Sequence, residues 1–193
     1  MTTRQQWMLV ASIVAVIALG LVAATRLMRD ELFPITIGST APNFRAKVLG
    51  ANRYKTLEDY KGKVVLLNLW ATWCEPCLRE MPSIERLHQA YGDKGLSVVS
   101  VSVDAYANDD SVRAFARNLG VTFEILRDST MGISDTYQST GYPETFVIDP
   151  ERTIRKRWIG AADWSSPGNR ALVAQLLGLE TPRVVPETRS GPR

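Results

Sequence analysis

The chain has 193 residues, of which 45% are hydrophobic and 22% are charged, with a formal net charge of +3. This is an ordinary globular composition that allows one well-filled core. Basic residues alternate with acidic ones and form no stripe that could follow phosphates, so nucleic acid is not an expected partner. The chain has only two cysteines, Cys74 and Cys77. They are too close in sequence to link distant parts of a fold, so a chemical role is expected for them.

The amino-terminal segment differs from the rest of the chain. No charged residue occurs from Gln5 to Thr25, and Trp7–Ala24 is almost wholly aliphatic. Because this run is long enough to cross a bilayer as a helix, residues 1–28 are predicted to be a membrane anchor. A signal peptide is the alternative, since Arg4 precedes the run and the small residues Val22-Ala23-Ala24 lie near its end. The run exceeds the usual apolar region of roughly 7 to 15 residues, which favours a retained anchor.

The orientation of this segment does not follow from its flanking charges. Arg4 lies on one side of it, and Arg26 and Arg29 lie on the other. A buried helix of the soluble core is a third interpretation, but such helices usually keep a polar stripe and this segment has none. A membrane-spanning helix of open orientation is therefore expected.

The remaining sequence divides into a tether at residues 29–38, a domain at residues 39–179 and a tail at residues 180–193. The domain is predicted to open with a hairpin, because residues 43–48 alternate in polarity and a turn signal follows at 49–52. The tail contains three prolines and no aromatic residue, and it is expected to be disordered.

The later elements of the domain alternate between strand and helix. The apolar run at residues 64–70 predicts a strand buried on both faces. Apolar spacing predicts a helix from Cys74 to near Gly92 that Pro82 should kink. Further expected elements are a strand at 96–103, a helix at 110–119, a hairpin of 145–148 with 154–159, and a helix at 168–177. The alternation implies a parallel core.

The Cys74-Glu75-Pro76-Cys77 run lies where the strand at 64–70 gives way to a helix. Thiol-disulfide exchange needs one attacking thiolate and a second sulfur near enough to displace the mixed disulfide. A cysteine at a helix amino terminus has its thiolate favoured by unpaired backbone N–H groups and by the helix dipole. Cys74 is therefore predicted to be the nucleophile and Cys77, one turn later, the resolving thiol.

Neighbouring residues should tune this pair. Pro76 fits the first helical turn without losing a needed donor, and Glu75 places a carboxylate near the developing thiolate, which should make the site less oxidising. Glu80 is expected to face the same region as a proton acceptor, although a solvated helix glutamate is equally compatible with the sequence. A zinc site is disfavoured because His88 is the only histidine, and His88 is expected to be an exposed helix residue.

Three segments carry a resemblance to a known family. They are Trp70–Cys77 with Glu80-Met81-Pro82, the preceding Lys61–Asn68, and Gly141–Asp149. Together they resemble the thioredoxin-like TlpA/ResA/CcmG family of membrane-anchored thiol-disulfide oxidoreductases, over roughly residues 38–178. The resemblance implies an α/β thioredoxin-like fold with a central mixed sheet flanked by helices, an N-terminal hairpin extension and an N-terminal transmembrane helix.

The resemblance also assigns roles to site residues. It implies that Pro143 forms a cis peptide bond and faces Cys74, and that the backbone of Tyr142 pairs with an extended substrate peptide. A trans proline at the start of a strand is the alternative. The family's acidic residue near the resolving cysteine corresponds to Glu80. Trp73 should cover the disulfide and contact partners, or else be a core aromatic.

Two departures limit the resemblance. The Glu75-Pro76 spacer resembles the ResA branch, whereas Pro143-Glu144-Thr145-Phe146 resembles the CcmG branch, so the subgroup is open. Peroxiredoxins share the superfamily and use a Pro-x-x-x-Thr-x-x-Cys motif. Here Leu67 and Ala71 occupy the Pro and Thr positions, which disfavours a peroxidase.

The expected function is reduction of protein disulfides on the extracytoplasmic, periplasmic side of the cytoplasmic membrane. The resemblance implies apocytochrome c, with its haem-attachment cysteines, as substrate and a membrane thiol carrier of the DsbD/CcdA type as electron donor. No organic cofactor or metal is expected. A general oxidant or isomerase, and a non-catalytic membrane-bound adaptor, are the alternatives. Asp104 is expected only to end a strand.

Overall fold

The computed structural model describes residues 3–27 and 35–179 of the chain. The chain separates into two compact units, and the second begins at Thr36. Most of the predicted tether and the whole predicted tail therefore lie outside the described residues. The last residues of that tether, Thr36 to Gly38, belong to the second unit, where the Gly38 N–H donates to the Ile154 carbonyl at 2.8 Å.

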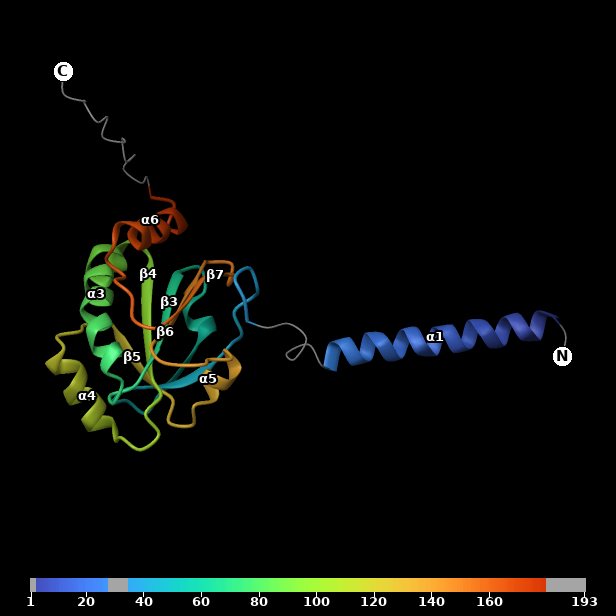
Figure 1. Cartoon of the computed structure of the whole chain (residues 1–193), viewed down its shortest axis with the longest axis horizontal. Helices are drawn as coiled ribbons and strands as arrows, with labels where there is room; N and C mark the ends of the chain where they lie inside the picture. The colour runs from blue at the N-terminus through green and yellow to red at the C-terminus, as the bar shows by residue number, and fades with distance from the viewer. Residues whose placement is uncertain (1–2, 28–34, 180–193) are drawn as a thin grey trace, which may run out of the picture. The chain divides into compact units, whose positions relative to one another are not determined.

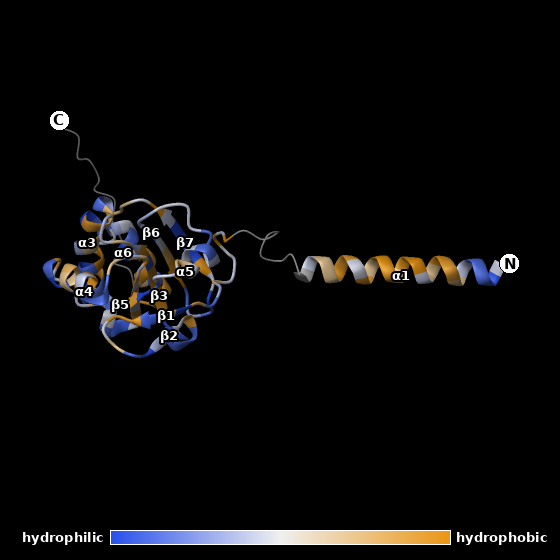
Figure 2. Ribbon diagram, turned by 90° about the horizontal axis from the view of Figure 1, so that it is seen from below, coloured by the Kyte–Doolittle hydropathy of each residue, from blue (hydrophilic) through white to orange (hydrophobic). Residues whose placement is uncertain are grey.

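The first unit is the apolar helix α1 (Thr3–Leu27). Its stretch Thr3–Thr25 has a mean hydropathy of 2.6 and none of it is buried in protein. Figure 2 shows it orange along most of its length, with a hydrophilic amino-terminal end. The predicted apolar helix is confirmed, and it is long and apolar enough to cross a membrane.

The second unit is one seven-stranded sheet in the order β2-β1-β5-β4-β3-β6-β7. β3, β4 and β5 pair in parallel, while β1, β2, β6 and β7 join antiparallel. The parallel core, the opening hairpin and the mixed sheet are thus confirmed. The strands are β1 (Arg45–Val48), β2 (Tyr54–Thr56), β3 (Val64–Trp70), β4 (Leu96–Ser102), β5 (Glu124–Arg127), β6 (Glu144–Ile148) and β7 (Ile154–Ile159).

Helices cover both faces of the sheet (Figure 1). The longer ones are α3 (Glu75–Tyr91), α4 (Asp109–Asn118) and α6 (Pro167–Leu176), and the short elements are α5 (Gly132–Thr136) and the 3-10 turns η1 (Leu57–Tyr60) and η2 (Gly92–Lys94). Ile84, Val112 and Val173 bring α3, α4 and α6 into one apolar cluster with Leu66 of β3. On the opposite face, Tyr137 packs edge-on against Phe146 of β6.

The strand β5 and the helix α5 were not predicted from the sequence, and the prediction for His88 was wrong. β5 has four residues and α5 has five, too few for a periodic apolar pattern. His88 was expected to be exposed. Instead it is partly buried and its ring lies edge-on to Phe123, because the turn of α3 that carries it faces the loop before β5. Pro82 lies inside α3, which continues to Tyr91.

The buried strand β3 generates a stability prediction. Leu66 is 0% exposed, so Leu66→Ala should leave a cavity and lower the free energy of unfolding by about 2 to 5 kcal/mol. Ile37, at 66% exposed, is the control, and Ile37→Ala should change stability by less than about 0.5 kcal/mol. Urea titration followed by tryptophan fluorescence measures both. Equal effects of the two substitutions would contradict the placement of β3 in the core.

Candidate active site

The candidate site begins where β3 ends. A short loop leads from Trp70 to Cys74, which is the N-cap of α3 and whose N–H donates to the Ala71 carbonyl at 3.1 Å. Thr72 in this loop is anchored by Asp104. The N–H and the hydroxyl of Thr72 both donate to the buried Asp104 carboxylate, at 3.0 and 2.6 Å. The loop is therefore fixed before the helix starts.

Cys74 and Cys77 are joined by a disulfide, with their Cα atoms 5.3 Å apart. The backbone N–H of Cys77 donates to Sγ of Cys74 at 3.2 Å. This donor and the amino-terminal end of the α3 dipole would both stabilise a thiolate at Cys74 once the disulfide is opened. Cys74 is 4% exposed and Cys77 is 1% exposed, so the first cysteine is the more accessible to an external sulfur.

Glu75 and Pro76 occupy the first turn of α3. The Glu75 side chain points to solvent, 82% exposed, and accepts a hydrogen bond from Arg79 at 2.9 Å within an ion pair. The Arg79 charge offsets the Glu75 charge near the sulfurs, although an ion pair this exposed is weak. Arg79 was not predicted from the sequence to be part of this site.

Glu80 is buried, 1% exposed, and lies one turn after Cys77 on α3. Its carboxylate accepts hydrogen bonds from Asn68 Nδ2 at 2.8 Å, the Thr145 hydroxyl at 3.3 Å and the Ala162 N–H at 2.9 Å. Burial raises the pKa of Glu80 to about 7, because desolvation outweighs the donors that favour the ionised form. The interpretation of Glu80 as a solvated helix glutamate is therefore wrong.

The loop before β6 lies beside the cysteines. Leu69 of β3 pairs with Glu144 of β6, so the preceding Pro143 is level with Trp70, the last residue of β3. The Tyr142–Pro143 peptide bond is cis, as the resemblance implied. Tyr142 packs against the apolar cluster that contains both cysteines. The structure thus brings the Cys loop and the proline loop together.

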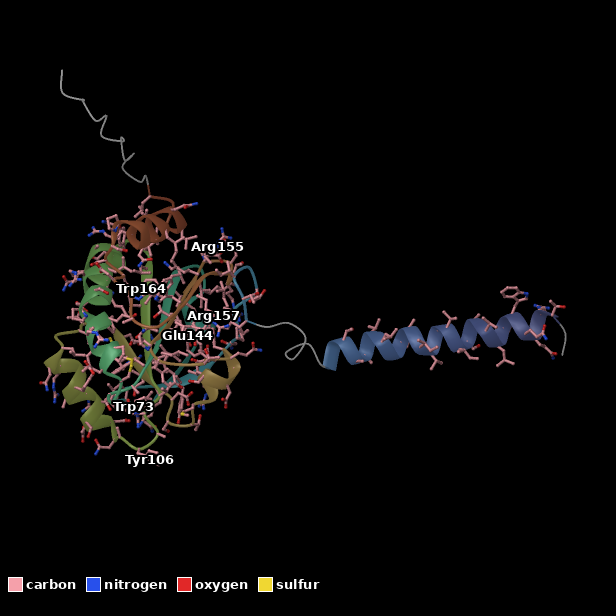
Figure 3. All side chains as sticks on the ribbon, in the orientation of Figure 1. Trp73, Tyr106, Glu144, Arg155, Arg157 and Trp164 are labelled. Carbon is pink, nitrogen blue, oxygen red and sulfur yellow. A yellow bond between two sulfur atoms is a disulfide. The ribbon has the colours of Figure 1, made fainter. Side chains whose placement is uncertain are left out.

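Two exposed aromatic side chains, Trp73 and Tyr106, lie at the same end of the domain (Figure 3). Trp73 is 69% exposed, so it is not a core aromatic, and its ring lies edge-on to Tyr142 at a centroid distance of 6.0 Å. The Tyr142 hydroxyl in turn hydrogen-bonds with Ser134 at 2.7 Å. Tyr106, which the sequence analysis did not select, is fully exposed at the same end.

Two buried carboxylates beside the site were missed or given lesser roles. Asp104 does more than end a strand, since it accepts hydrogen bonds from Thr72 and Ser102 and so anchors the Cys loop. Glu144 is 0% exposed and is paired with Arg157. The sequence offered one signal for each, a charged residue next to an apolar strand. Among residues 3–27 and 35–179, no group of three or more His, Cys, Asp or Glu side chains could hold a metal ion.

Comparison with known proteins places the chain in a family. Residues 37–157 match the AhpC/TSA family. The chain is 44% identical to the thioredoxin-like protein YneN of Bacillus subtilis over 124 residues, which is 64% of this chain and 71% of that protein. It is 34% identical to the thiol-disulfide oxidoreductase ResA of Geobacillus kaustophilus over 144 residues, which is 75% of this chain and 80% of that protein.

A solved structure agrees with these relatives. The putative thiol:disulfide interchange protein DsbE from Chlorobium tepidum superimposes with a TM-score of 0.63 and 26% identity, over 74% of this chain and 96% of that one. The thioredoxin-like fold and the resemblance to the ResA group are therefore confirmed. The chain belongs to the thioredoxin-like AhpC/TSA family and is a thiol-disulfide oxidoreductase of the ResA/DsbE type, with Cys74–Cys77 as its active-site disulfide.

Proposed function

We propose that this oxidoreductase is a reductase that keeps protein cysteines reduced outside the cytoplasm, and that its substrate is the haem-attachment Cys-x-x-Cys-His of apocytochrome c. The observation that carries the proposal is the placement of Cys74, the less buried of the two sulfurs, at the start of α3 and beside the cis-proline loop, with Glu80 buried one turn after Cys77. This arrangement suits transfer of two electrons to a docked disulfide.

The proposed cycle starts from the dithiol. The Cys74 thiolate attacks one sulfur of the substrate disulfide, and the other substrate sulfur leaves as a thiolate that takes a proton. Glu80 then accepts the proton of the Cys77 thiol, and the Cys77 thiolate attacks Sγ of Cys74. The substrate leaves with both cysteines reduced, while the protein leaves with the Cys74–Cys77 disulfide. Two electrons have moved from the protein to the substrate.

Substrate docking is assigned to Trp73, Tyr142 and Pro143. The exposed ring of Trp73 offers apolar contact area, and the backbone of Tyr142, just before β6, is proposed to pair with a cysteine-containing peptide. Glu75 and Pro76 are assigned to tuning of the potential, with Arg79 moderating the Glu75 charge.

The proposed reaction also suggests where the domain works and what reduces its Cys74–Cys77 disulfide. An oxidising compartment removes free thiols, and haem attachment requires them, so a dedicated reductant has a role there. We therefore place the domain on the extracytoplasmic side of the cytoplasmic membrane, with α1 as a single-pass anchor. The oxidised protein would be recharged by a membrane thiol carrier of the DsbD/CcdA type.

The reduction potential of the Cys74/Cys77 couple tests the direction of the reaction. Equilibration of the full chain in detergent with dithiothreitol or glutathione buffers should give a value near or below about −250 mV, the range of thioredoxin-like reductants. A value above about −150 mV would sink the reductase proposal and favour a general oxidant or isomerase.

A trapping experiment tests the roles of the two cysteines and the substrate. Cys77→Ser should accumulate a mixed disulfide between Cys74 and apocytochrome c, because the resolving thiol is gone. Cys74→Ser should accumulate none. Detection is by non-reducing electrophoresis of cells that express each variant. If Cys77→Ser captures nothing while the wild-type chain is inert toward disulfide peptides, the adaptor alternative gains support.

The pH dependence of resolution tests Glu80. A base acts only when it is deprotonated, and the Glu80 pKa is raised to about 7, so the release rate of the mixed disulfide should rise as pH increases through 7. Glu80→Gln should remove this rise and slow release by roughly 100-fold at pH 8. Stopped-flow fluorescence measures the rate.

A stability measurement separates this effect from unfolding. A carboxyl whose folded pKa lies above its unfolded value stabilises the fold when protonated, and that contribution is lost as pH rises from about 4.5 through about 7. Glu80→Gln should therefore be at least as stable as the wild type at pH 8. A slower release in a destabilised variant would not support the role of Glu80 as a base.

A further inference from the structure

The carboxylate of Glu144, the residue directly after the cis-proline, is fully buried and accepts hydrogen bonds through both of its oxygens. Oε1 of Glu144 accepts from Nε of Arg157 at 2.6 Å. Oε2 accepts from the Ser139 hydroxyl at 2.6 Å and from the Thr140 N–H at 3.3 Å. The two groups that donate to Oε2 therefore lie near the start of the segment 138–144, which carries Pro143, and Glu144 is the last residue of this segment.

Arg157 completes the connection. Its Nη2 donates to the carbonyl of Gln138 at 2.7 Å, and its guanidinium lies over the ring of Phe146 at 5.5 Å. In the sheet register, Arg157 of β7 is opposite Phe146 of β6, which places it diagonally from Glu144 on the same face. Glu144 and Arg157 lie beside each other in Figure 3. The ion pair thus closes the segment 138–144 into a loop held at both ends.

This loop carries the groups proposed to dock the substrate. The Tyr142 ring of this loop contacts the ring of Trp73. The Pro143 carbonyl accepts a hydrogen bond from the Gly160 N–H at 2.8 Å, which connects the loop to the end of β7. A buried ion pair is not needed for stability, because an apolar pair of similar volume does as well or better. A charge-assisted pair instead fixes the relative orientation of the two segments that it joins, because the planar guanidinium binds the carboxylate in a defined geometry.

We propose that the Glu144–Arg157 pair is a positioning device that holds the Tyr142–Pro143 backbone in register with Cys74 for docking of an extended peptide disulfide. The inference deepens the proposed function and rests on it. The pair does not touch the reacting sulfurs. It should therefore affect substrates that need the strand edge and leave unaffected small disulfides that reach Cys74 without it.

The test compares two substrates with the full chain in detergent. One is an oxidised Cys-x-x-Cys peptide, and the other is the small aromatic disulfide 5,5′-dithiobis(2-nitrobenzoate). Arg157→Gln should raise KM for the peptide about tenfold, as expected for losing one charge-assisted contact, while kcat and the rate with the small disulfide stay within about twofold. Glu144→Gln should act in the same direction.

Arg155 provides the matched control. It lies on the same strand, is 49% exposed and is 3.7 Å from Asp149, so Arg155→Gln removes the same charge without touching the loop. Ser139→Ala is a second, milder variant that keeps the test possible if Arg157→Gln does not fold. This substitution removes one hydrogen-bond donor to Glu144 and leaves the Glu144–Arg157 ion pair in place. It should raise the peptide KM about twofold and spare the small disulfide.

Three outcomes would overturn the inference. They are equal losses on both substrates, a peptide KM that does not respond to Arg157→Gln and Ser139→Ala, and a response of Arg155→Gln as large as that of Arg157→Gln. Failure of the proposed function is a different result. If the protein oxidises dithiol peptides instead of reducing disulfides, the same KM comparison is made in the oxidising direction, where docking uses the same loop.

Discussion

β3 is hydrogen-bonded on both sides, in parallel to β4 and antiparallel to β6, and each of its side chains is buried. This strand cannot shift without disrupting both neighbours and both layers of the core. Its end therefore fixes where the loop to Cys74 starts, and the register of β6 fixes where Pro143 stands beside that loop. The reactive disulfide and the cis-proline are brought together by one buried strand.

The buried carboxylates of Glu80 and Glu144 lie on opposite faces of the sheet, next to the start of β6. Side chains of Glu144 and Thr145 alternate across β6, so they point to different layers. Thr145 donates to Glu80 on the α3 side, whereas Glu144 is held by Arg157 on the side of α5. The first residues of β6 thus contact the proposed proton acceptor on one face and the loop proposed to dock the substrate on the other. A shift in the start of this strand would disturb both.

The sequence predicted features that depend on local pattern. The apolar run of β3, the start of α3 at Cys74 and the hairpin of β6 and β7 are each encoded by neighbouring residues. Interactions between distant residues were not predictable in this way. The Asp104–Thr72 contact joins residues 32 positions apart, and the burial of Glu80 depends on Ala162, 82 positions away. Spacing and the resemblance together indicated Glu80, and the resemblance alone indicated the cis bond at Pro143, but the pairing of Glu144 with Arg157 required the structure.

The burial of the second cysteine links two parts of the proposed mechanism. Cys77 is 1% exposed, so its sulfur is shielded from external partners, and in the proposed cycle it attacks Sγ of Cys74 in an internal step. A base inside the protein suits such a step, because the thiol is buried. The same burial raises the pKa of Glu80 to about 7, which is where a general base is most effective at neutral pH. The packing of α3 against β3 therefore both buries Cys77 and raises the pKa of Glu80, the group proposed to deprotonate it.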